Sequence, residues 1–112
     1  MTSHLHTSLW VNAHIRQCFI NNIPAFVLAR GDKERGGILL KVNQFSAGVR
    51  LLQPIASMGN ERVWAYVNGV ESIEDAAADA IIQKKRSMDP DLWVIEIEDV
   101  NGLYDLGEPI EG

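Results

Sequence analysis

The fold class is decided near the C-terminus, where the chain reads Leu92-Trp93-Val94-Ile95-Glu96-Ile97-Glu98. Successive side chains of a strand point to opposite faces, so this stretch predicts a strand with Trp93, Ile95 and Ile97 on one face. The alanine-rich stretch before it predicts a helix that opens at Ser72 and ends at Asp89-Pro90, because alanine favours helices and proline stops them. The chain therefore combines helices with strands.

Four further candidate strands precede that helix. They are separated by turn-forming residues and span residues 25–30, 38–43, 49–53 and 62–67. In the second of them, Ile38, Leu40 and Val42 are expected to face inward, and Lys41 and Asn43 outward. The turns between the strands are short, which favours antiparallel pairing, because parallel strands need a long crossover.

A first helix is predicted from Leu9, with Ser8 as its N-cap and Asn21-Asn22-Ile23-Pro24 as its stop. The order is then helix, four strands, helix and strand (α-β-β-β-β-α-β). This order predicts an α+β fold, with a largely antiparallel sheet of about five strands and two helices on one face.

The length of 112 residues fits one domain that can bury a core of its own. We expect residues 1–8 to be a flexible N-terminal leader, residues 9–106 to be the single domain, and residues 107–112 to be a flexible tail. Near the end of the domain, Asn101-Gly102 predicts a tight turn, and residues 103–106 are expected to return as a short strand.

Composition indicates where the protein works. The single cysteine, Cys18, cannot pair within the chain, which fits a reducing compartment. No stretch has the length and apolar character of a membrane span, and the first twenty residues lack the pattern of a secretory signal. We therefore expect a cytoplasmic protein that does not enter membranes.

The net charge of −5 is unevenly distributed along the chain. Residues 1–88 contain ten basic and seven acidic side chains, whereas residues 89–112 contain eight acidic side chains and no basic one. The acidic part could pair with the basic remainder, or it could present an acidic surface to a basic partner.

The sequence lacks the common catalytic motifs. It has no phosphate-binding loop of the P-loop type, no dinucleotide fingerprint, no Gly-x-Ser-x-Gly elbow and no Cys-x-x-Cys pair. His14 and Cys18 are spaced to share a helix face, as a thiolate nucleophile or half of a zinc site would require, but a buried structural cysteine is the favoured interpretation. The tripeptide Arg30-Gly31-Asp32 is interpreted as a hairpin turn.

Acidic residues supply one candidate site. Glu96 and Glu98 project from one face of the last strand, and Asp89 and Asp91 lie just upstream. Such carboxylates could bind a cation for a metal-dependent hydrolase. The competing interpretation is a solvated strand end that resists aggregation.

Tryptophan and arginine residues supply a second candidate site. Trp10, Trp64 and Trp93 could stack single-stranded nucleic acid, although the acidic chain makes core or interface packing the favoured interpretation. The arginines that would assist such stacking are Arg16, Arg30, Arg50 and Arg62. Alternatively, Arg16 and Arg30 could hold a small anionic ligand. The decisive question is whether these arginines and tryptophans converge on one pocket.

Several segments resemble a known family. Asp89-Pro90-Asp91-Leu92-Trp93-Val94-Ile95-Glu96-Ile97-Glu98-Asp99 resembles the C-terminal signature of DUF1491, a small alphaproteobacterial family of proteins of unknown function. Leu9-Trp10-Val11 with Ala13 and Arg16, then Arg30-Gly31-Asp32 and Leu40-Lys41-Val42-Asn43, are also similar to its pattern. The likeness runs from Ser8 to Leu106, with Gln17 where the family often has a second arginine. It implies a bacterial cytosolic protein and brings no established activity.

We therefore expect a non-enzymatic binding or adaptor domain without a cofactor, whose partner is another protein or a second copy. The alternatives are the metal-dependent hydrolase and the single-stranded nucleic-acid binder. The candidate binding residues are Trp10, Arg16, Arg30, Asp89, Asp91, Trp93, Glu96 and Glu98.

Overall fold

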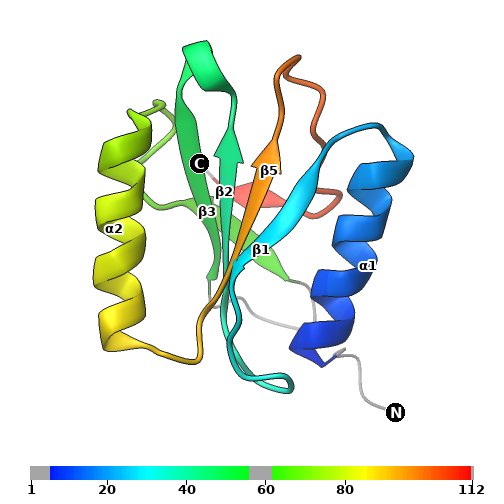
Figure 1. Ribbon diagram of the computed structural model, residues 1–112, viewed down its shortest axis with the longest axis vertical. Helices are drawn as coiled ribbons and strands as arrows, with labels where there is room; N and C mark the ends of the chain where they lie inside the picture. Colours follow the sequence, from blue (N-terminus) through cyan, green and yellow to red (C-terminus); the bar gives the residue numbers. More distant parts are fainter. Residues whose placement is uncertain (1–5, 56–61, 112) are drawn as a thin grey trace.

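The computed structural model describes residues 6–55 and 62–111 and contains two long helices and a six-stranded sheet (Figure 1). In chain order the elements are α1 (Thr7–Ile20), β1 (Ala25–Ala29), β2 (Ile38–Asn43), the 3-10 turn η1 (Phe45–Ala47), β3 (Val49–Ile55), β4 (Val63–Tyr66), α2 (Asp75–Met88), β5 (Trp93–Glu98) and β6 (Ile110–Glu111). The predicted α+β class and the order of the first seven helices and strands are confirmed, and β6 is an addition.

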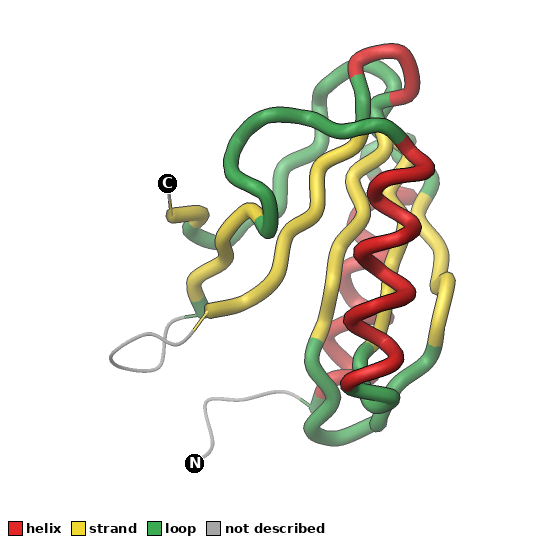
Figure 2. Tube along the Cα trace, turned by 90° about the vertical axis from the view of Figure 1, so that its left-hand side faces the viewer, coloured by secondary structure: helices red, strands yellow, loops and turns green. Residues whose placement is uncertain are grey.

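The sheet is mixed. Its strand order is β1-β5-β2-β3-β4-β6. The β2–β3 and β3–β4 pairs are antiparallel, as the short turns predict, and the β1–β5 pair is antiparallel as well, whereas β2–β5 and β4–β6 are parallel. The short connection between β1 and β2 does not make them neighbours, because β5 lies between them. The parallel β2–β5 pair is possible because two strands and α2 intervene in the chain, which supplies the long connection that such a pair needs. The sheet twists strongly from its β1 edge to its β4 side (Figure 2).

The two helices cover opposite faces of the sheet, so the expectation that both lie on one face is wrong. Figure 1 shows the sheet standing between α1 and α2. One core contains Leu40 and Ile95 together with α1, and the other contains Leu39 and Val94 together with α2. Because β2 and β5 are apolar on both faces, each face needs its own cover.

Strand alternation predicted that Lys41 faces solvent, and this prediction is wrong: Lys41 lies under α2. Its side chain is 4% exposed, and its Nζ lies 2.7 Å from Asp75, 2.9 Å from Asp79 and 3.4 Å from Glu96. Burial alone would lower the pKa of Lys41, but the hydrogen bonds to Asp75 and Asp79 and the charge of Glu96 outweigh it and raise that pKa well above its usual range. This ionic cluster ties α2 to the centre of the sheet.

Both helices begin away from their predicted caps. α1 starts at Thr7, whose hydroxyl donates to the carbonyl of Gly36 at 2.8 Å, so Ser8 lies inside the helix and not at its N-cap. α2 starts at Asp75, so the Ser72 capping pattern lies before the helix. The predicted stop of α1 is confirmed: Asn22 adopts a left-handed φ of 61°, and the Ile23 amide donates to Cys18 at 2.8 Å.

The C-terminal segment, residues 99–111, packs against the same face of the sheet as α1. Tyr104 and Leu106 join the core that contains α1, but residues 103–106 do not form the expected return strand. The strand lies further along, where β6 pairs with β4. The expected flexible tail therefore contributes a strand to the sheet, while the expected leader lies mostly outside the described residues, apart from its last three residues.

No helix in the described ranges has the length and apolar character needed to cross a membrane.

Replacing Lys41 with methionine should lower the free energy of unfolding by about 3 kcal/mol, because it leaves Glu96 in a low-polarity site without its cation. Urea denaturation measures this loss. The matched control is Lys84→Met on the exposed side of α2, which should change stability by less than about 0.5 kcal/mol. Equal effects of the two substitutions would contradict the anchoring role of Lys41.

Candidate functional site

The structure separates the residues that were expected to share a binding site. Trp10 and Trp93 are buried at 9% and 2% exposure, and Arg16 is exposed on α1. Arg30 lies over the Trp93 ring, 5.6 Å from its centroid. Trp93 also donates its indole N–H to the Asp32 carbonyl at 2.7 Å, so its interactions hold the turn after β1 in place. The arginines and tryptophans therefore do not converge on one pocket.

The segment Arg30-Gly31-Asp32 has a structural role, but the predicted hairpin is wrong, because β5 lies between β1 and β2 in the sheet and the segment connects two strands that do not pair. The Asp32 carboxylate accepts the backbone N–H of Arg35 at 2.8 Å. A Cβ on Gly31 would lie only 2.0 Å from the carbonyl oxygen of Asp91, so only glycine fits this contact.

The acidic residues are also dispersed. Asp89 accepts the backbone N–H of Asp91 at 3.1 Å in the turn before β5. Glu96 belongs to the Lys41 cluster under α2, and Glu98 ends β5 beside the loop that follows α1. Among the described residues, no three acidic, histidine or cysteine side chains are grouped to hold a metal ion. The structure thus gives no support to the metal-dependent hydrolase.

All three tryptophans are buried, as the packing interpretation predicts, and their rings are not free to stack bases. Trp10 and Trp64 both donate their indole N–H to Glu108, at 3.1 Å and 2.6 Å. Sequence reasoning missed Glu108. The sequence did contain one indication, because a buried tryptophan indole N–H needs a hydrogen-bond acceptor. Glu108 binds the C-terminal segment to both α1 and β4.

His14 and Cys18 do not form a reactive pair. Nε2 of His14 lies 2.6 Å from the hydroxyl of Tyr104, and its ring stacks on Trp10. Burial, followed by the charge of Asp99, raises the pKa of the Cys18 thiol to about 11. Cys18 is therefore the buried structural cysteine that the sequence favoured.

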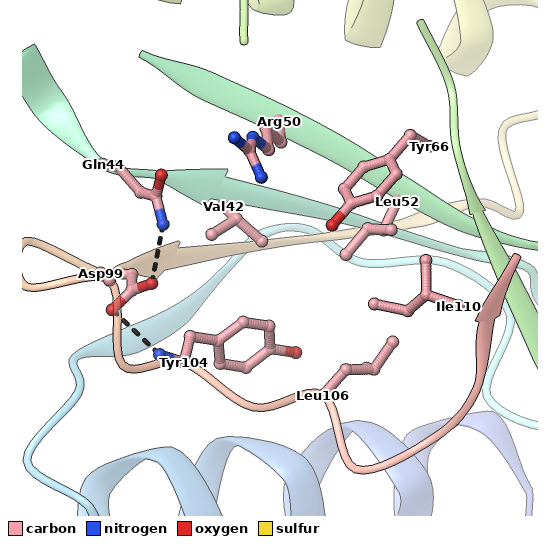
Figure 3. A pocket seen from close by; sticks show the side chains of 10 residues that line it. Val42, Gln44, Arg50, Leu52, Tyr66, Asp99, Tyr104, Leu106 and Ile110 are labelled. Atoms are coloured by element: carbon pink, nitrogen blue, oxygen red, sulfur yellow. Dashed lines mark hydrogen bonds between the residues drawn. The ribbon is translucent and has the colours of Figure 1, made fainter. Parts of the chain in front are cut away.

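A cavity of about 200 Å³ lies between the sheet and the C-terminal segment (Figure 3). We call it the C-terminal cavity. It combines apolar with polar side chains, and the lining residues that matter below are Gln44, Arg50, Leu52, Tyr66, Asp99 and Tyr104. Sequence reasoning missed this site, because its residues come from β2, β3, β4, β6 and the loops after β2 and β5, and they show no motif.

Asp99 organises one end of the C-terminal cavity. One carboxylate oxygen accepts the backbone N–H groups of Leu103 and Tyr104 at 2.8 Å and 3.1 Å, and the other accepts the Gln44 amide at 3.0 Å. Three donors therefore compensate a carboxylate that is only 3% exposed. Asp99 fixes the path of the chain as it leaves β5.

Burial lowers the pKa of His14, and the negative charge of Glu108 only partly offsets this. At acidic pH the unfolded chain then binds a proton that the folded chain resists, so stability should fall as the pH falls through the ordinary histidine range. Urea denaturation at about pH 7.5 and about pH 5.5 should show a smaller loss in His14→Gln than in the wild type. His6→Gln, at an exposed position, should keep the wild-type loss; equal losses in all three proteins would contradict the role of His14.

Comparison with known proteins identifies the family. The family model for DUF1491, described as a protein of unknown function, matches residues 5–105. A crystal structure and an NMR structure of a DUF1491 family protein from Caulobacter crescentus CB15 are each 35% identical to the chain, with TM-scores of 0.85 and 0.81. Both matches cover 96% of this chain, and they cover 100% and 97% of those chains.

A solution structure of a protein from A. tumefaciens is 24% identical, with a TM-score of 0.76, and shows the same fold over 93% of this chain and 90% of its own. None of the curated proteins compared with the chain matches it. The family model and the Caulobacter structures agree over nearly the whole length, and the chain belongs to the DUF1491 family.

Proposed function

We propose that the chain is a non-enzymatic binding domain that holds a small molecule in the C-terminal cavity. The observation that carries the proposal is the cavity itself, in which polar groups from β3, β4 and the C-terminal segment converge on one space. Small-molecule sites characteristically combine an apolar lining with a few placed polar groups. The volume of about 200 Å³ lies below the roughly 300–1,000 Å³ of ordinary ligand pockets, so the ligand is small.

The polar groups around the cavity favour holding a ligand over transforming one. Asp99 is fully engaged with three donors, and Tyr104 is paired with His14. Burial raises the pKa of Tyr104 far above its ordinary value, so its phenol stays neutral. The unpaired Cys18 supports a cytoplasmic location for this binding function.

A panel of amino acids, short carboxylates, sugars and phosphate esters tests the proposal by amide NMR titration. At least one compound should shift the amides of residues 99–106, and Ile110→Trp, which fills the cavity from β6, should weaken that binding about tenfold or more. The control is Leu103→Trp on the same segment but outside the cavity lining. The proposal fails if no compound shifts these amides, or if Ile110→Trp binds as the wild type does.

We also propose that two copies associate through β1. Among the strands that the structure describes, β1 pairs with β5 alone and forms an edge of the sheet, where Phe26 and Leu28 are 41% and 44% exposed. Between Ala25 and Ala29 the strand contains no charge, and antiparallel pairing of two copies about Val27 would place each Phe26 beside Leu28 of the other copy. The edge is therefore complementary to itself.

Light scattering across a concentration series tests this association. The wild type should become dimeric as concentration rises, and Phe26→Ser should remain monomeric because it removes apolar area from the edge. Val70→Ser, at another exposed apolar position, should dimerise as the wild type does. A wild type that stays monomeric at every concentration would overturn the association.

A further inference from the structure

The C-terminal cavity contains a guanidinium that forms no ion pair with any described residue. Arg50 lies on β3, opposite Val42 of β2, and its side chain lines the cavity. Its Nε is buried and has no hydrogen-bond partner among the described residues. All the ion pairs that the described residues form belong to Lys41, on the other face of the sheet. Among the described residues, the charge of Arg50 therefore has no carboxylate partner, and its Nε is shielded from solvent.

An uncompensated donor of this kind is costly. A buried N–H without an acceptor destabilises the folded state, and the penalty is larger when the group is charged. The nearby Asp99 does not relieve the cost, because it forms no ion pair with Arg50 and its oxygens accept instead from Gln44, Leu103 and Tyr104. The Tyr66 ring, 5.9 Å from the guanidinium, supplies a cation–π contact but no acceptor in the guanidinium plane.

The rest of the lining separates into a polar and an apolar part. Figure 3 shows Arg50 and the hydroxyl of Tyr66 directed into the same space, with Leu52, Leu106 and Ile110 gathered beyond them. A guanidinium presents a planar fork of donors that matches the oxygens of a carboxylate or phosphate group. The leucine and isoleucine side chains would then cover an apolar body attached to that group.

We infer that the ligand of the C-terminal cavity is a small amphipathic oxyanion, a carboxylate or phosphoryl group with a short apolar body, held by Arg50. This inference rests on the proposed small-molecule binding and adds the chemical class of the ligand. It also relocates the anion site, which the sequence suggested at Arg16 and Arg30. Arg16 is exposed on α1, and Arg30 lies over Trp93.

NMR titration with butyrate, ethyl phosphate and the neutral butyramide tests the inference. At least one anion should shift the side-chain Nε–H signal of Arg50, which is assigned by its absence in Arg50→Gln. Which anion does so distinguishes a carboxylate from a phosphoryl ligand. Butyramide has nearly the shape of butyrate without its charge, and it should bind at least about tenfold more weakly.

Substitutions test whether Arg50 is the residue that binds the anion. Arg50→Gln should weaken anion binding about tenfold or more and leave butyramide unaffected, whereas Arg16→Gln should leave both unchanged. Arg50→Lys keeps the charge but loses the planar fork, so it should bind between these limits and serves if Arg50→Gln does not fold.

The inference is overturned if neither anion binds, if butyramide binds as tightly as the anions, or if the Arg50 variants retain wild-type anion affinity. The last two results would leave small-molecule binding itself intact. The proposal of small-molecule binding fails on a different result: no compound of the panel shifts any amide of residues 99–106 in the wild type.

Discussion

The architecture depends on one constraint: the central strands β2 and β5 carry large apolar side chains on both faces and must be covered on both. Leu39 and Val94 face α2, while Leu40 and Ile95 face α1. Parallel pairing aligns the two strands, with Leu39 opposite Val94 and Leu40 opposite Ile95. A helix on each face is the response to this pattern, because buried strands leave no side for solvent.

The buried polar side chains mainly attach one element of the fold to another. Lys41 attaches α2 to the sheet through Asp75, Asp79 and Glu96. Glu108 attaches the C-terminal segment through the two indoles of Trp10 and Trp64. Of the acidic residues after Arg86, Glu96 and Glu108 thus make contacts inside the molecule, but among the described residues only Glu96 forms an ion pair with a basic side chain.

The same C-terminal segment creates the cavity on which the proposed function rests. Asp99 turns the chain away from β5, and Glu108 fixes it again against α1 and β4. Between these two attachments the segment passes over Arg50 and Tyr66 and encloses a space with the sheet. Membership of DUF1491 supplies the fold and no activity, so the chemistry of this space is the best guide to function.

The sequence by itself determined the α+β class, the chain order of the main elements and the family, because alternation, helix stops and turn residues are local signals. It also indicated a structural role for the turn at Arg30 and for the three tryptophans. Only the tertiary structure decided which face each helix covers, since β2 and β5 carry apolar side chains on both faces and either face could receive a helix. It also decided the environment of Lys41 and Arg50. Both are cations on strands, and local sequence does not distinguish the one surrounded by carboxylates from the one facing a cavity.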